Sequence, residues 1–359
     1  MTQNIDAIIF GAANEVEIRQ VPLPPMNDNE IVVKTLFTMV SSGTELRVFS
    51  GRGEATGRFP LIPGYCVVGE IVEVGSNVKG WKVGDLVSGR NPEKSSPGLQ
   101  MVYGGQQSRH VYPTSGYGQP VLLPQGAVPL DYIITEVAAI SGRGVRMAAP
   151  LPGETAVVVG QGLVGALSAA WLVDAGCRVI AVDIAAGRLE RSARWGVSAA
   201  INARDNVAAR LAALCPGGAD IVVDASATPV GFKLACSLLR PAEYRILRNP
   251  TWPRLVVQAS YTDEIPLHPT GFFPGDGALV LTPGDRRPED RAAAVEAIRT
   301  GRLPTAAFLD QVVPYKDAPL AYPRLRDEPN SVFSLVFDWN VAAADSTPGT
   351  GCQPAVPAA

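Results

Sequence analysis

The feature that most constrains the fold is an apolar run followed at once by a glycine-rich turn and a second apolar run. Residues 155–160 read TAVVVG, and residues 163–176 read LVGALSAAWLVDAG. The first run has the length and β-branched content of a buried strand, and the second has the length of a helix. Further apolar runs lie at 177–183, 220–226 and 254–260. This alternation with helical stretches predicts a parallel sheet with helices on both faces.

The turn between strand and helix is a GxGxxG motif over residues 160–165. The motif is informative because it follows a predicted strand and opens a predicted helix. Its first glycine permits a tight turn, and its second lets the backbone approach a pyrophosphate at the helix N-terminus. Its third glycine lets the helix pack closely on the strand. The residues expected to contact a dinucleotide here are Gly160, Gly162, Leu163, Val164 and Gly165.

An acidic residue is expected at the end of the second strand, about 20 residues after the motif. Asp183 occupies that position. Its carboxylate would accept hydrogen bonds from the adenosine ribose and repel a 2′-phosphate, which favours NAD(H) over NADP(H). Arg188 is expected over the adenine or on the surface. Ala225 and Ser226, which close the run at 220–226, are expected to line the same site.

The rest of the chain has a different character. Residues 5–90 consist of short β-branched runs separated by turn-forming residues, which predicts a barrel-like β unit. Residues 91–130 are rich in Gly and Pro and predict long loops of the kind that often carry function. Helical patterns follow at 132–148 and 289–300, and residues 301–340 return to a β-and-turn character.

Bulk composition argues against several classes of protein. The 359 residues are 47% hydrophobic and 18% charged, which is enough to build the cores of two domains. A net charge of −3 disfavours nucleic acid and anionic membranes as partners. No apolar run reaches the ~18–20 residues of a membrane-spanning helix, and the N-terminus lacks a signal-peptide pattern. We therefore expect a cytoplasmic protein with a small-molecule substrate, five scattered free cysteines and a flexible tail over 341–359.

Residues 60–87, PLIPGYCVVGEIVEVGSNVKGWKVGDLV, resemble the signature of the medium-chain dehydrogenase/reductase family of zinc-type alcohol dehydrogenases. The resemblance covers nearly all of residues 5–340. It implies an α/β protein with a GroES-like β-barrel catalytic domain over residues 1–150, completed by 300–340. A Rossmann NAD-binding domain with a doubly wound parallel sheet is implied over 151–299.

The same resemblance indicates that the family's catalytic metal is absent. Zinc-dependent members carry Gly-His-Glu where this chain has Gly64-Tyr65-Cys66, and Cys-Gly-Ser/Thr-Asp where it has Ser42-Gly43-Thr44-Glu45. Glu136 matches a third ligand that is a glutamate in some members. The four cysteines of the structural zinc lobe have no counterpart. Ser and Tyr are poor zinc ligands beside Cys and His, so we predict no metal.

Hydride transfer without zinc needs a group that polarises the substrate oxygen and moves a proton. Tyr65 is the first candidate, because its phenol takes the place of the metal-ligating histidine. Thr44 would relay the proton, and Glu45 or Glu136 would orient the hydroxyl groups or accept the proton. His110 is a second acid/base candidate in the loop-rich part of the β unit.

The segments SSGTE, PLIPGY and YGGQQSRHV are similar to a zinc-lacking subgroup of the family that includes the bacteriochlorophyllide dehydrogenase type. We therefore expect a zinc-independent, NAD-dependent oxidoreductase that interconverts a secondary alcohol and a ketone on a polar or cyclic substrate of a specialised biosynthetic pathway. The resemblance also implies a homodimer formed through the Rossmann domain. Two alternatives stay open: a zinc-free quinone or enoyl reductase, and a non-redox protein or lyase with tightly bound NAD.

Overall fold

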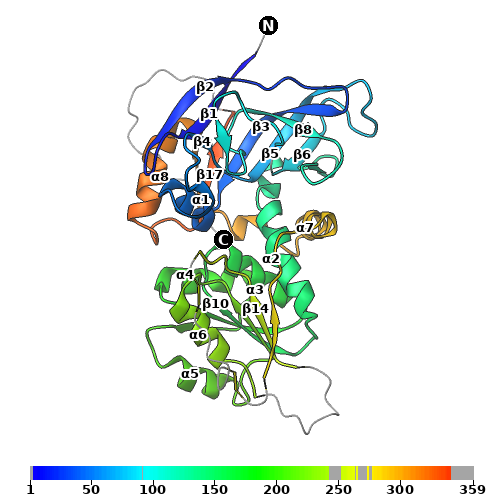
Figure 1. The fold of residues 1–359 in the computed structure, drawn as a ribbon. Coiled ribbons are helices and arrows are strands. Elements are labelled where there is room, and N and C mark those ends of the chain that lie inside the picture. The colour runs from blue at the N-terminus through cyan, green and yellow to red at the C-terminus, as the bar shows by residue number, and fades with distance from the viewer. Residues whose placement is uncertain are drawn as a thin grey trace, which may run out of the picture.

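The computed structural model describes residues 3–90, 92–241, 252–262, 264–265, 273–274 and 277–340. The flexible tail expected over 341–359 lies outside these residues. The chain forms two units, one above the other in Figure 1. The upper, β-rich unit is built mainly from the N-terminal part of the chain, and the lower unit holds a sheet covered by helices.

Two sheets form the β-rich unit. The larger runs in the order β16-β17-β3-β5-β6-β9, with β8 also paired to β3, and the smaller runs β2-β1-β4-β7. The strands are β1 (Asn4–Phe10), β2 (Val16–Pro22), β3 (Glu30–Val40), β4 (Leu61–Ile62), β5 (Cys66–Val74), β6 (Leu86–Gly89), β7 (Gln100–Met101), β8 (Arg109–Pro113), β9 (Val121–Leu122), β16 (Gln311–Pro314) and β17 (Leu335–Asp338). Because β17 pairs antiparallel with β3, the C-terminal part of the chain returns to complete the N-terminal sheet.

The second sheet is wholly parallel, as the sequence predicted, and runs β12-β11-β10-β13-β14-β15. Its strands are β10 (Thr155–Val159), β11 (Arg178–Asp183), β12 (Ala199–Asn202), β13 (Ile221–Asp224), β14 (Arg254–Val257) and β15 (Leu279–Leu281). Its helices are α3 (Leu163–Asp174), α4 (Ala186–Ser192), α5 (Val207–Leu214) and α6 (Pro229–Ser237). The chain reverses direction along the sheet between β10 and β13, and such a switch point opens a ligand crevice at the carboxyl ends of the strands.

Helix α2 (Thr135–Ala148) joins the two units. It packs on α3, on α7 (Pro288–Arg299) and on β14, and it contacts β5 and β6 of the upper unit (Figure 1). The largest buried apolar cluster follows this path from Tyr65 through Ile134 and Ala138 to Leu167 of α3. Burial of this continuous apolar surface holds the two units together. In the part of the chain that the structure covers, no helix is long and apolar enough to cross a bilayer.

A helix, α1 (Ser42–Phe49), follows β3 directly, where the sequence predicted only strands and turns. The Glu45 carboxylate accepts a hydrogen bond from the Ser41 N–H at 2.8 Å and so stabilises the first turn of the helix. The prediction failed here because the helix is short and its start coincides with the segment that supplies the site.

A second helix, α8 (Ala318–Asp327), corrects the β-and-turn prediction for residues 301–340. Pro319 lies in its first turn, where the missing N–H leaves no hydrogen bond unmade. Pro323 lies inside the helix, which is unfavourable in isolation. Tyr322 and Leu325 are buried in one apolar cluster with Val48 and Phe49 of α1, and this packing stabilises the helix.

Candidate active site

The glycine-rich turn has the geometry that a dinucleotide requires. Gly160 has a φ of +93°, in the region that favours glycine. A Cβ on Gly165 would lie 1.9 Å from the Gly160 carbonyl oxygen, so only glycine lets α3 approach β10 this closely. Gly162 caps α3 without a side-chain hydrogen bond, and the first N–H groups from Leu163 onward are uncapped. An uncapped helix N-terminus is a suitable site for a pyrophosphate.

Asp183 ends β11 and faces this turn. Its Oδ2 accepts a hydrogen bond from the Gln161 N–H at 2.6 Å, and its Oδ1 accepts one from the Ala185 N–H at 2.8 Å. A carboxylate can accept about four hydrogen bonds, so acceptor capacity remains for ribose hydroxyls. Arg188 Nη1 lies 4.0 Å from Asp183 Oδ2, and Nη2 donates to the Pro329 carbonyl at 3.0 Å.

The remaining predicted cofactor residues lie at the same edge of the sheet. The Ala225 carbonyl oxygen would be 2.7 Å from a Cβ on Gly160, so the segment after β13 borders the glycine turn. Ser226 Oγ donates to Asp224 Oδ1 at 2.7 Å. The Val164 carbonyl accepts a hydrogen bond from Ser168 at 2.9 Å within α3. The fold thus brings the predicted cofactor residues together at the carboxyl ends of β10, β11 and β13.

Tyr65 lies in the β-rich unit just before β5, with its side chain buried. Its hydroxyl lies 2.5 Å from Ser41 Oγ. Burial raises the pKa of Tyr65, while the hydrogen bonds from Ser41 and Thr44 and the Arg90 charge oppose that rise. The phenol is therefore neutral at physiological pH and can donate a hydrogen bond or a proton.

Glu136 lies in the first turn of α2 and is fully buried. Its Oε2 is 2.7 Å from Arg286 Nε, which donates a hydrogen bond to it. Its Oε1 is 2.7 Å from Arg291 Nε, a charge contact whose angle falls short of a hydrogen bond. Two guanidinium groups thus hold the carboxylate that the sequence suggested as a leftover metal ligand.

The side chains at the family's metal position do not fit a zinc ion. Glu136 faces two cations, and the Tyr65 hydroxyl lies 2.5 Å from Ser41 Oγ, whereas zinc is bound by Cys, His and free carboxylate side chains. Ser42 begins α1 and offers only a neutral hydroxyl. Among the described residues, no group of three or more His, Cys, Asp and Glu side chains could hold a metal ion.

Glu45 holds the residues around Tyr65 in place through its hydrogen bonds. Its Oε2 accepts hydrogen bonds from Tyr322 at 2.6 Å and from Gln106 Nε2 at 3.2 Å, and its Oε1 binds the Ser41 N–H. Burial raises the pKa of Glu45 to about 7, although these three hydrogen bonds oppose the rise. Glu45 therefore holds Ser41, which in turn contacts the Tyr65 hydroxyl.

The structure corrects the acid/base role expected for His110. The side chain is fully buried on β8, with Nδ1 3.1 Å from Thr35 Oγ1 and Nε2 3.2 Å from the Gly105 carbonyl oxygen. Burial lowers its pKa to about 3, so the ring is neutral. Both nitrogens have partners inside the sheet, which leaves no nitrogen for a substrate.

Sequence reasoning missed Arg90, the cation that lies beside Tyr65. Arg90, directly after β6, places its guanidinium carbon 4.8 Å from the centre of the Tyr65 ring and 5.2 Å from that of Tyr103. Its Nη1 lies 2.5 Å from Asp285 Oδ1. Because Asp285 is far along the chain, no local pattern signals the pair.

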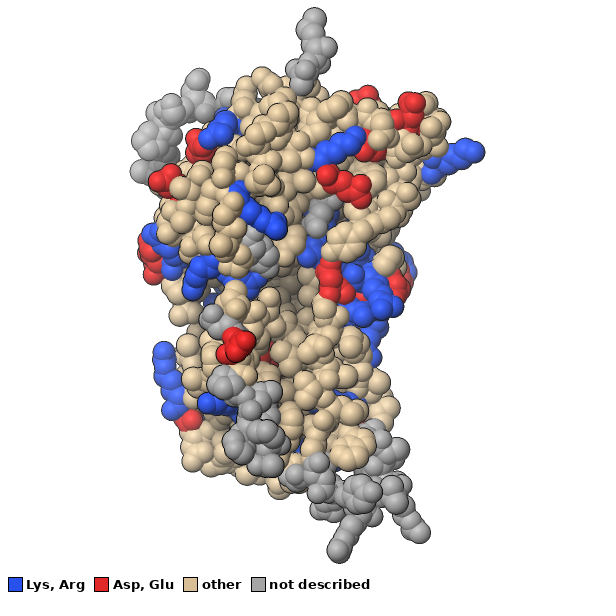
Figure 2. Space-filling view, viewed as in Figure 1, with Lys and Arg blue, Asp and Glu red and all other residues tan. Residues whose placement is uncertain are grey.

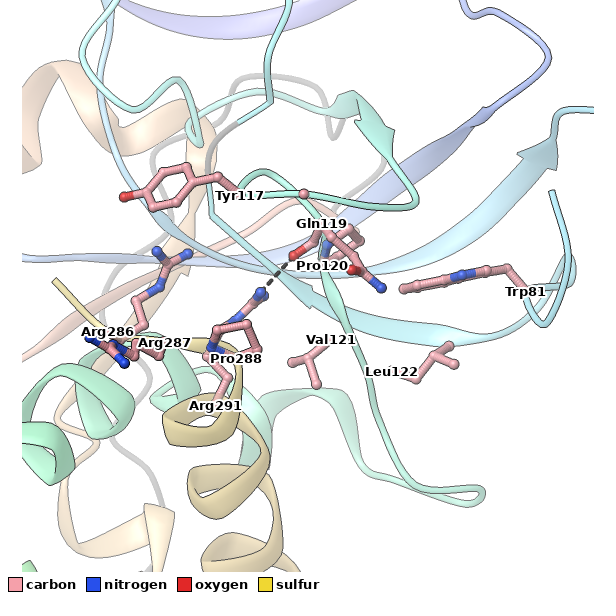
Figure 3. A pocket seen from close by; sticks show the side chains of 11 residues that line it. Trp81, Tyr117, Gln119, Pro120, Val121, Leu122, Arg286, Arg287, Pro288 and Arg291 are labelled. Carbon is pink, nitrogen blue, oxygen red and sulfur yellow. Dashed lines mark hydrogen bonds between the residues drawn. The ribbon is translucent and has the colours of Figure 1, made fainter. Parts of the chain in front are cut away.

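A surface pocket of about 220 Å³ lies beside this network, at the start of α7. Figure 3 shows the Tyr117 ring above Arg286, and the guanidinium carbon is 5.3 Å from the ring centre. Arg291 extends from α7 and donates to the Gln119 carbonyl at 2.6 Å. Tyr117 also donates a hydrogen bond to Asp285, which links the pocket to Arg90.

Comparison with known proteins agrees with this arrangement. The family model described as "Alcohol dehydrogenase GroES-like domain" matches residues 27–128, and "Zinc-binding dehydrogenase" matches residues 164–244. L-threonine 3-dehydrogenase from Photorhabdus laumondii subsp. laumondii is 30% identical over 234 residues, 59% of this chain and 67% of the relative. The enzyme of the same name from Streptomyces avermitilis is 30% identical over 208 residues, 54% of this chain and 60% of the relative.

Solved structures show the same fold. An oxidoreductase of unknown specificity from Escherichia coli superposes with a TM-score of 0.80 at 18% identity, over 94% of this chain and 99% of that one. The 2R,3R-butanediol dehydrogenase from Bacillus subtilis gives 0.76 at 19% identity, over 94% and 100%. These matches confirm the predicted pairing of a GroES-like unit with a Rossmann unit. The chain belongs to the zinc-type alcohol dehydrogenase family of medium-chain dehydrogenases.

Proposed function

We propose that this chain is an NAD(H)-dependent oxidoreductase that interconverts a secondary alcohol and a ketone without a catalytic zinc. The observation that carries the proposal is the pairing of an intact dinucleotide turn and Asp183 with a metal position filled by Tyr65 and arginine side chains. The curated relatives named above are dehydrogenases, which supports the reaction class. The bound nicotinamide would supply or accept the hydride.

In the direction of reduction, Tyr65 donates a hydrogen bond to the ketone oxygen and polarises the carbonyl. As negative charge develops on that oxygen, the Tyr65 proton passes to it. A proton from water then returns to Tyr65 through the Ser41 hydroxyl, which lies 2.5 Å from the phenol, and Thr44 is a second relay group. The Arg90 cation beside the Tyr65 ring stabilises the transient phenolate. Glu45 acts as a positioning residue, since its contacts are with Ser41, Gln106 and Tyr322.

Membership of the zinc-lacking subgroup that includes the bacteriochlorophyllide dehydrogenase type stays a hypothesis about ancestry and does not fix the substrate. We propose instead a polar or cyclic substrate from a specialised biosynthetic pathway, handled by a cytoplasmic enzyme. Two alternatives are tested by a substrate screen. One is a quinone or enoyl reductase, and the other is a protein with tightly bound NAD but no redox turnover. That screen follows NADH absorbance with sugars, cyclitols, aromatic alcohols, quinones and enones.

Tyr65→Phe removes the proposed proton donor and keeps the ring that packs beside Arg90. We expect kcat to fall by about a hundredfold or more, because positioned acid/base groups contribute on the order of 10²–10⁴. NADH affinity, measured by fluorescence titration, should not change.

The matched control is Tyr112→Phe, which removes a buried hydroxyl that has no hydrogen-bond partner. This control should retain full turnover, and so should the wild-type protein after dialysis against a chelator. Unchanged turnover in Tyr65→Phe would contradict the role assigned to Tyr65, and loss of turnover on chelation would contradict zinc independence.

Asp183→Ser tests the cofactor preference. Loss of the carboxylate removes the repulsion of a 2′-phosphate and an acceptor for the ribose, so NADH affinity should fall and NADPH affinity should rise, each by about tenfold. Titration of both reduced cofactors checks this, with Asp205→Ser as the control because Asp205 is exposed and pairs with Arg210. Tighter binding of NADPH than NADH by the wild type would overturn the assignment.

Glu45 gives a pH dependence of stability. Its pKa rises from 4.5 to about 7 on folding, so between these values the folded state keeps a proton that the unfolded state releases. The free energy of unfolding should therefore fall as pH rises through this interval, by up to about 3 kcal/mol. Glu45→Gln lacks this term. Urea unfolding from pH 5 to 8 should show the wild type losing stability relative to the variant, and parallel curves would refute the buried acid.

We also propose a homodimer formed through the edge strand β15 of the parallel sheet. Leu279 and Val280 of that strand are 49% and 48% exposed, and an exposed apolar edge strand favours pairing with another chain. Leu279→Lys should weaken the dimer in light scattering after size-exclusion chromatography, while Val312→Lys, on β16 of the other unit, should not. A monomeric mass for the wild type at micromolar concentration in the same measurement would contradict the proposed dimer.

A further inference from the structure

Five charged side chains form one ion network at the family's metal position. Arg90 contacts Asp285 at 2.5 Å, Arg286 contacts Asp285 at 3.2 Å and Glu136 at 2.7 Å, and Arg291 contacts Glu136 at 2.7 Å. Three guanidinium groups therefore face two carboxylates. All three arginines are at most 7% exposed, so the surplus positive charge is poorly screened by solvent.

The three arginines differ in which of their N–H donors already have partners. Arg291 donates its two Nη groups to the Gln119 and Ser88 carbonyls and faces Glu136 with Nε. Arg286 donates Nε to Glu136 and Nη1 to Asp285. Arg90 pairs with Asp285 through Nη1. The Nε atoms of Arg90 and Arg291 are both buried without a hydrogen-bond partner, but Arg291 Nε faces Glu136 Oε1 at 2.7 Å. A buried unpaired donor on a charged group is destabilising, and a bound acceptor would remove that destabilisation.

Arg90 is also held in a fixed orientation. Its guanidinium lies over the Tyr65 and Tyr103 rings, at 4.8 and 5.2 Å from their centres. Burial alone would lower its pKa, but the carboxylates of Asp285 and Glu136 raise it above the ordinary value, so the group is always cationic. A planar, pre-oriented guanidinium with unused donors is well suited to bind a carboxylate or phosphate.

We infer that the substrate carries an oxyanion, a carboxylate or a phosphate, and that Arg90 binds this group next to Tyr65. The inference rests on the proposed function for the identity of the reaction but not for the anion site itself. Figure 2 shows Lys and Arg side chains, with Asp and Glu side chains beside them, on the flank where Figure 1 places α7. Arg90 then fixes the substrate beside the Tyr65 hydroxyl, and specificity for charged over neutral alcohols follows.

The first test measures anion binding without cofactor or turnover. Acetate and inorganic phosphate are titrated into the wild type by calorimetry, together with Arg90→Gln, Arg90→Lys and the control Arg210→Gln, which changes an exposed arginine paired with Asp205. We expect affinity to fall by at least about tenfold in Arg90→Gln, to fall less in Arg90→Lys and to stay unchanged in the control. Anions that bind at the glycine turn contribute equally to all four proteins.

Equal affinity in Arg90→Gln and wild type would overturn the anion site and leave the proposed oxidoreductase standing. NADH affinity of each variant, measured in parallel, shows that the protein is folded. Should Arg90→Gln fail this check, Arg90→Lys alone decides, since lysine keeps the charge and loses the planar fork. Wild-type affinity in Arg90→Lys then contradicts the inference.

The second test uses turnover with matched pairs of substrates that differ in one carboxylate or phosphate. Arg90→Gln should raise KM for the charged member by about tenfold or more and leave KM for the neutral member within about twofold. An equal rise in KM for both members would refute the anion site, whereas a fall in kcat shared by both members is the expected loss of charge stabilisation at Tyr65 and bears on the proposed function. Absence of turnover in the wild type would instead contradict the proposed function.

Discussion

The buried ion pairs of Glu136 are the contacts on which the site depends. Glu136 lies at the start of α2, the helix that joins the two units, and binds Arg286 and Arg291 at the start of α7. Arg291 reaches on to the Ser88 carbonyl of β6. Removal of one partner would leave a buried charge uncompensated, which is strongly destabilising. The network therefore fixes the helices against the β-rich unit and sets the charge of the site.

Under the proposed zinc-free reaction, the same network supplies positive charge beside Tyr65. A zinc ion supplies a fixed positive charge that anionic ligands neutralise in part. Here Arg90 stands beside Tyr65, and Asp285 and Glu136 neutralise two of the three guanidinium charges.

Much of the fold was predictable from local patterns. The TAVVVG strand, the glycine turn and the strand ending at Asp183 are each marked by residues next to one another in the chain, and their positions agree with the structure. The helices α1 and α8 were missed, because one is short and the other contains two prolines. His110 was misjudged because its loop-rich sequence context gives no sign of its burial on β8.

The sequence by itself determined that a dinucleotide-type turn exists, since that is a matter of residue identity at a motif, and it predicted that Tyr65 stands where zinc-dependent members of the family carry a metal-ligating histidine. Only the tertiary structure decided what surrounds Tyr65. Arg90 and Asp285 are separated by 195 residues, and Glu136 and Arg286 by 150. Ion pairs between such residues depend on how β6, α2 and α7 pack, and no periodicity or spacing along the chain encodes that packing.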